Sequence, residues 1–182
     1  MMKNESKFLC KNQSTAANFN LNYSKYLLIK KDYSQINLNV VLKSIKDEFV
    51  CLLGISEDFM QINRLPIIMA KQKQIHHLFK TIIGNALKFK GEEPLNIIIS
   101  AEDQETMWEI KIKDNAIAVE DIYHKSIFEE ANYLKRNVHC KRAEIGLLIC
   151  RKILEAHGGT ITIQSNPVNG CEFTIWLPKT QF

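Results

Sequence analysis

A chain of 182 residues has the length of one domain with an appendage. Hydrophobic residues make up 46% of it, which provides a packed core and excludes a wholly disordered chain. The net charge is +4 and charges of both signs are interspersed, which argues against a nucleic-acid-binding protein.

The cysteines and the N-terminus point to the cytoplasm. Five cysteines are an odd number and form no Cys-x-x-Cys pair, which favours reduced thiols over a disulfide framework or a zinc site. The first residues lack the apolar stretch of a signal peptide. No apolar run approaches the roughly 20 residues needed to cross a bilayer, so we expect no membrane segment.

The first 35 residues are expected to be a leader. Residues 1–20 are polar, and residues 21–31 predict a short helix. Asn37 is a candidate N-cap for a helix over residues 38–52. The apolar residues of that helix recur at helical spacing: Leu38, Val41, Leu42, Ile45 and Phe49.

Short strands are predicted at residues 59–63 and 67–69, followed by a helix over 71–88 with a clear apolar stripe. The stripe consists of Ile75, Leu78, Phe79, Ile82, Ile83, Ala86 and Leu87. A nearly continuous apolar run predicts a strand at 95–101, and a polar turn is expected at 102–105.

Alternating apolar residues predict a strand over 105–113, with Asp114 at its end on the buried side. A long loop over 115–143, with a short helix near Ile127, is typical of a functional lid. A helix over 145–157 precedes strands at 160–165 and 171–177, joined by a turn at Asn169-Gly170. These elements predict an α/β two-layer sandwich, in which about five strands form a mixed sheet covered on one face by three helices.

Four blocks occur in order along most of the chain: residues 65–70 (LPIIMA), 85–89 (NALKF), 114–118 (DNAIA), and 145–147 (IGL) with 157–159 (HGG). Together with Gly170, Phe173 and Leu177-Pro178, they resemble the ATPase domain of sensor histidine kinases, which has the Bergerat fold. Phytochrome-like and hybrid sensor kinases are the most similar in pattern. The resemblance covers residues 36–180, and Tyr23-Ser24-Lys25 resembles the tail of the preceding dimerisation helix.

The resemblance implies ATP and Mg²⁺ as ligands. Asn85 matches an asparagine that coordinates Mg²⁺, a role suited to a hard carboxamide oxygen. Lys88 matches a residue near the phosphates. Asp114 matches the aspartate that accepts a hydrogen bond from the adenine amino group, and an ordinary strand-capping aspartate is the alternative.

Several positions depart from the family pattern. Thr81 replaces a usual asparagine, and Ala116 and Ala118 replace glycines that allow close backbone approach. The second glycine box reads RAEIG over residues 142–146, so that only Gly146 survives, followed by Leu147. In that box Glu144 would repel phosphate, and Arg142 would restore part of the affinity.

The phosphoacceptor histidine of these kinases has no counterpart in residues 1–35. We therefore expect weakened nucleotide binding and no autophosphorylation. The sequence allows three readings: an ATPase subunit that phosphorylates a partner in trans, a pseudokinase acting as a docking module, and a solitary anti-sigma-factor-type kinase. The phytochrome-like blocks and the segment at Tyr23 argue against the third, and the joint loss of glycines and of the asparagine at Thr81 favours the second over the first. The resemblance implies a response regulator or sensor histidine kinase as partner, and it allows a homodimer.

Overall fold

The computed structural model describes residues 33–124, 126–129 and 141–179, and for residues 141–145 it describes the backbone alone. The helix expected over 21–31 and the block at Tyr23 lie outside these residues, as do the side chains of Arg142 and Glu144.

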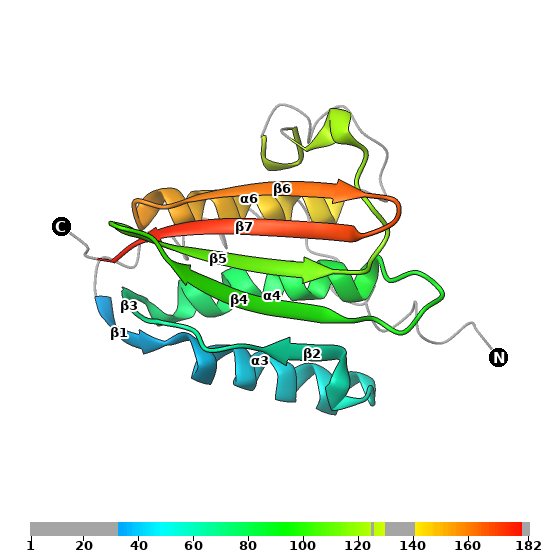
Figure 1. The fold of residues 1–182 in the computed structure, drawn as a ribbon, viewed down its shortest axis with the longest axis horizontal. Coiled ribbons are helices and arrows are strands. Elements are labelled where there is room, and N and C mark those ends of the chain that lie inside the picture. The colour runs from blue at the N-terminus through cyan, green and yellow to red at the C-terminus, as the bar shows by residue number, and fades with distance from the viewer. Residues whose placement is uncertain (1–32, 125, 130–140, 180–182) are drawn as a thin grey trace. The chain divides into compact units, whose positions relative to one another are not determined.

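The centre of the fold is a mixed sheet of five strands (Figure 1). In spatial order the strands are β2 (Met60–Ile62), β4 (Ile97–Asp103), β5 (Met107–Asp114), β7 (Gly170–Pro178) and β6 (Thr160–Asn166). The β2–β4 pair is parallel and the other three pairs are antiparallel. Because β6 has one strand neighbour, it forms an edge of the sheet.

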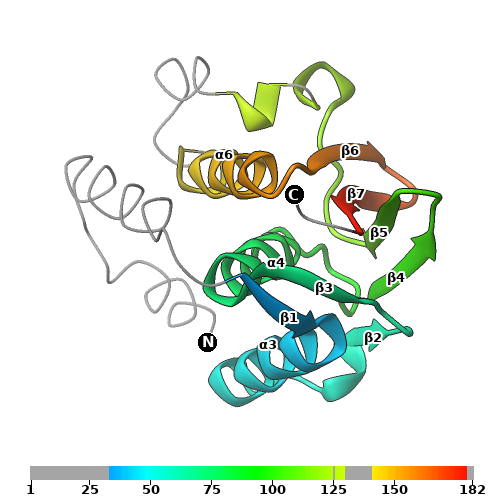
Figure 2. The ribbon, with the colours of Figure 1, turned by 90° about the vertical axis from the view of Figure 1, so that its left-hand side faces the viewer.

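Three helices form a second layer on one face of the sheet: α3 (Leu38–Leu53), α4 (Gln72–Lys88) and α6 (Lys141–Ala156) (Figure 2). The predicted apolar stripe of α4 is buried from Ile75 to Ala86, and Leu87 is half-buried. On the sheet, Ile110 and Ile112 are fully buried, as their alternation predicted. The two-layer sandwich and its three helices are therefore confirmed.

Two predicted helix-capping residues, Asn37 and Gly158, are also confirmed. The side chain of Asn37 accepts a hydrogen bond from the Asn39 backbone N–H at 3.0 Å, which satisfies a free donor at the start of α3. Gly158 follows α6 with φ of 70°, a left-handed conformation that glycine adopts without strain.

A second, two-stranded sheet pairs β1 (Tyr33–Asn37) with β3 (Ile67–Lys71) and is attached to the end of α6. The Tyr33 hydroxyl donates to the Ala156 carbonyl at 2.9 Å. The buried His157 ring accepts from the Lys71 backbone N–H at 3.1 Å through Nε2, and its Nδ1 lies 2.7 Å from the Ile153 carbonyl. A neutral imidazole that donates from Nδ1 satisfies both contacts.

Some boundaries differ from the prediction. Strand β1 was not expected, because Ile36 is its only buried residue and gives no alternation to detect. Strand β4 continues to Asp103, through residues assigned to a turn, because Asp103 pairs with Trp108. Helix α6 begins at Lys141, four positions before the expected start at Ile145. No helix in the described part of the chain is long and apolar enough to span a bilayer.

Candidate nucleotide pocket

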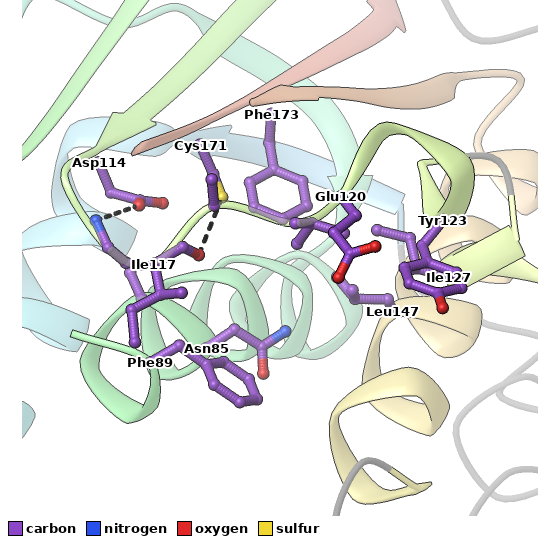
Figure 3. A pocket seen from close by; sticks show the side chains of 14 residues that line it. Asn85, Phe89, Asp114, Ile117, Glu120, Tyr123, Ile127, Leu147, Cys171 and Phe173 are labelled. Atoms are coloured by element: carbon purple, nitrogen blue, oxygen red, sulfur yellow. Dashed lines mark hydrogen bonds between the residues drawn. The ribbon is translucent and has the colours of Figure 1, made fainter. Parts of the chain in front are cut away.

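A cavity of about 380 Å³ lies between the end of β5, the last turns of α4 and the loop after β5. This volume falls within the range of about 300–1,000 Å³ that small-molecule pockets occupy. Its lining is mostly apolar and comprises Asn85, Ala86, Phe89, Asp114, Ala116, Ile117, Ala118, Val119, Glu120, Tyr123, Ile127, Leu147, Cys171 and Phe173. The cavity therefore collects side chains from most of the motif blocks (Figure 3).

Asp114 forms the polar group at one end of this cavity. It is the last residue of β5, pairs with Cys171 of β7 and is only 3% exposed. Its Oδ1 accepts a hydrogen bond from the Ala116 backbone N–H at 2.9 Å. Burial raises the pKa of the Asp114 carboxyl, although the backbone N–H groups of Ala116 and Cys171 act in the opposite direction. The carboxyl is thus a fixed hydrogen-bonding group at the end of a rigid strand.

The position of Asp114 depends on Gly170, the first residue of β7. Gly170 has φ of 75°, and a Cβ added there would lie 2.1 Å from the Asp114 carbonyl oxygen. Only glycine combines this backbone conformation with so close an approach. The β6–β7 turn therefore packs directly against the end of β5.

Asn85 supplies a second polar group, from the last turn of α4. Its carboxamide extends into the cavity (Figure 3), and its Nδ2 atom is buried without a hydrogen-bond partner among the described residues. A buried donor of this kind costs free energy unless a ligand or water accepts its hydrogen bond. The observation is consistent with a polar ligand group at this place.

The loop after β5 is held at several points. Asn115 accepts from the Asn96 backbone N–H at 2.8 Å and donates to the Pro94 carbonyl at 3.0 Å. The Ser165 hydroxyl donates to the Val119 carbonyl at 2.6 Å, and His124 Nε2 lies 2.8 Å from the same hydroxyl. These contacts fix the part of the loop that lines the cavity.

Sequence reasoning missed Ser165, His124 and Glu120. Val119 and Ser165 are 46 positions apart, and His124 and Ser165 are 41 apart, so no local pattern connects them. Glu120 lines the cavity from the loop over 115–143, which the sequence predicted as a functional lid without indicating this residue.

The cavity brings together five of the eight predicted site residues: Asn85, Asp114, Ala116, Ala118 and Leu147. Lys88 does not line it, and the Lys88 Nζ atom instead lies 4.7 Å from the centre of the Phe89 ring. Gly146 does not line it either. A Cβ on Gly146 would lie 2.8 Å from Thr81 Cγ2, which places Gly146 in the contact between α4 and α6.

Thr81 also belongs to the helix contact. One turn before Thr81, the Leu78 carbonyl accepts from the fully buried thiol of Cys150 at 3.7 Å, and burial raises the pKa of this thiol to about 12. The replacement of asparagine by Thr81 is therefore accommodated by packing against α6.

The charges around the cavity are unfavourable for a triphosphate. Asp114 and Glu120 carry carboxyl groups, and none of the described lining side chains is a lysine or arginine. The apolar walls and Asp114 fit an adenine base, which needs a flat apolar slot and an acceptor for its amino group. The described lining residues offer one carboxamide, from Asn85, and no cation, which is a poor fit for the phosphate end of Mg·ATP.

Residues 70–181 match the model of the family described as "Histidine kinase-, DNA gyrase B-, and HSP90-like ATPase". The chain is 29% identical over 156 residues to the phytochrome-like protein Cph1 of Synechocystis. The aligned region is 84% of this chain and 21% of the relative. It is 35% identical over 114 residues to cyanobacterial phytochrome A of Nostoc, covering 63% of this chain and 15% of the relative.

Solved structures agree on the fold. The catalytic domain of histidine kinase ThkA has a TM-score of 0.66 at 22% identity, covering 82% of this chain and 97% of that one. Full-length ShkA in complex with AMPPNP has a TM-score of 0.67 at 19% identity. The match covers 92% of this chain and 37% of that one. The chain thus spans a small part of its curated relatives, and the matched part is one domain. Family match, fold and pocket together show that the chain belongs to the histidine kinase-, DNA gyrase B- and HSP90-like ATPase family, as a histidine kinase-type ATP-binding domain of two-component signalling.

Proposed function

We propose that this domain still binds an adenine base through Asp114 but holds Mg·ATP more weakly than an intact member of its family. The observation that carries the proposal is the distribution of polar groups in the cavity. A buried acceptor is retained at the base end, whereas the described lining at the other end offers no cation.

The substituted glycines support the same conclusion. Ala116 and Ala118 both line the cavity, where the family has glycines and where a methyl group takes space from a ligand. Gly146 packs against Thr81 instead of facing the cavity. Each charge-assisted hydrogen bond to a phosphate contributes about 1.5–3 kcal/mol. The loss of two such bonds lowers the affinity for ATP by roughly a hundredfold or more.

Calorimetry with Mg·ATP and Mg·ADP tests this proposal. We expect dissociation constants well above the micromolar range. Binding at micromolar concentration or tighter would overturn the proposal, and Arg142 would then be the compensating residue. In that case Arg142→Ala should abolish the binding.

We further propose that the chain does not autophosphorylate and acts through a partner, either a sensor histidine kinase or a response regulator, in the cytoplasm. Two of its histidines are engaged in structural contacts: His157 is 1% exposed and His124 bonds to Ser165. The free thiols of Cys51, Cys150 and Cys171 suit a reducing compartment.

Incubation with γ-labelled ATP tests this second proposal. We expect no acid-labile phosphate on the isolated protein, and such a label would refute the proposal. Transfer of label to an added response regulator or kinase stem would instead favour a separate ATPase subunit that acts in trans. A nucleotide-independent complex with such a partner would favour a docking module, as a monomer or a homodimer.

A further inference from the structure

Glu120 occupies the end of the cavity opposite Asp114. Asp114 and Cys171 lie on one side of Phe173, and Glu120 lies on the other side beside Tyr123 and Leu147 (Figure 3). The Glu120 carboxylate extends into the space that Asn85 borders from below in this view. A ligand whose base contacts Asp114 therefore directs its remaining part toward Glu120.

Glu120 is exposed, and its carboxylate has no cationic neighbour among the residues that the structure describes. No described lysine, arginine or histidine forms an ion pair with Glu120. Lys88 of α4 lies over the Phe89 ring, and Arg151 of α6 pairs with Glu155 at 2.9 Å. The loop contacts of Val119 and His124 with Ser165 hold the backbone on either side of Glu120 in place.

These observations have opposite consequences for two ligand classes. A ribose presents hydroxyl donors that a carboxylate can accept, and its oxygens can accept from the unpaired Nδ2 of Asn85. A phosphate chain brings further negative charge toward a carboxylate that no described cation screens. The cavity thus suits an uncharged nucleoside better than its phosphates.

We propose that Glu120 is a specificity-determining residue that makes the cavity prefer an uncharged adenine nucleoside over ATP. This inference rests on the proposed binding of adenine at Asp114 and adds the class of ligand that the opposite end selects. Affinity falls from adenosine to AMP to ATP, as each phosphate adds charge near Glu120.

Calorimetric or NMR titration of the protein with adenosine, AMP and ATP, the nucleotides with and without Mg²⁺, tests the inference. We expect wild type to bind adenosine more tightly than ATP. Glu120→Gln keeps the shape of the side chain and removes its charge, so it should tighten ATP about tenfold and leave adenosine within about twofold. The preference of wild type should also shrink at high ionic strength.

Glu129→Gln is the matched control, because Glu129 lies on the same loop but does not line this cavity. It should leave all affinities unchanged, and thermal unfolding should show that both variants are folded. An ATP-to-adenosine ratio unaltered by Glu120→Gln would overturn the inference, although weak ATP binding would still stand.

Weaker Mg·ATP binding in Glu120→Gln would also overturn the inference, since it would make Glu120 a metal ligand. Binding of neither adenosine nor ATP by any variant would refute adenine binding itself, and the inference with it.

Discussion

Asp114 combines a structural contact with the adenine-binding role that we propose for its carboxyl group. It ends β5 and accepts from the Ala116 backbone N–H, yet it also lines the cavity. Burial raises the pKa of this carboxyl, so the fold destabilises its charged form relative to the same group in water. Binding and stability therefore respond differently to its replacement.

Asp114→Asn should separate the two roles. The amide keeps an acceptor for Ala116 and avoids a buried charge, so we expect the free energy of unfolding to change by no more than about 1 kcal/mol. The adenine amino group should lose the carboxyl oxygen that accepts its hydrogen bond, so adenosine affinity should fall at least about tenfold. Urea unfolding and calorimetry measure the two effects.

Asp103→Asn is the control for this prediction. Asp103 lies on the same sheet, outside the cavity, and pairs with Lys179. Its replacement should leave adenosine affinity unchanged. If Asp114→Asn bound adenosine as wild type does, Asp114 would be a strand-capping residue only.

At the scale of elements, the contact between α4 and α6 depends on the absence of a side chain at Gly146. Gly146→Ala should destabilise the protein by about 1 kcal/mol, because the added methyl meets Thr81 Cγ2 at 2.8 Å and overpacking outweighs the gain in helix propensity. Thr81→Ser removes the Cγ2 methyl of Thr81, so it should restore stability in the double variant. A double-mutant cycle by urea unfolding measures the coupling, and additive effects would contradict this account.

The turn between β6 and β7 is a second sensitive contact between elements. Gly170→Ala should cost about 2–4 kcal/mol of stability, because it forces alanine to φ of 75° and places Cβ 2.1 Å from the Asp114 carbonyl oxygen. Gly91→Ala is the control, since nothing lies within 4 Å of a Cβ there, and it should be nearly neutral. Equal melting temperatures for the two variants would show that the turn can move away from β5.

The sequence predicted the elements that have strong periodicity and missed those without it. The stripe of α4 and the alternation of β5 depend on local spacing, so both were found. The start of α6 was missed because residues 141–144 contain no large apolar side chain. In the site, Asn85 and Asp114 could be found from motif position, whereas Ser165 and His124 act through contacts across more than 40 positions. Lys88 matched the motif, yet its side chain packs on Phe89.

At the scale of the whole molecule, His157 joins the β1–β3 sheet to α6. Burial lowers the pKa of this imidazole, and the positive charge of Lys71 adds to the effect. Its two ring contacts require the neutral form. The stability of the assembled layers is therefore linked to pH.

The sign of this linkage follows from the lowered pKa. Above the unfolded-state value of about 6.5, both states are neutral and the full stability is present. As the pH falls toward the lower folded-state pKa, the unfolded state takes up more protons and the free energy of unfolding decreases. We expect His157→Phe to be less stable at pH 8 but to lose less stability between about pH 6.5 and 5.

Urea unfolding across this pH range measures the difference in slope between the variants. Ile36→Val is the control, because it removes a buried methyl group from β1 and leaves every titratable group in place. It should retain the slope of wild type. A slope in His157→Phe equal to that of wild type would place the linkage elsewhere.

The cavity has two ends of different construction. Asp114 and Gly170 belong to the sheet, where backbone contacts leave little freedom for substitution. Ala116, Ala118 and Glu120 belong to the loop, whose residues contribute less to the core. Substitutions at the loop end can therefore change ligand affinity at a smaller cost in folding stability than substitutions at the sheet end. On our proposal, the adenine-binding end is therefore retained by the same contacts that hold the sheet together, whereas the other end can change its ligand preference through the loop.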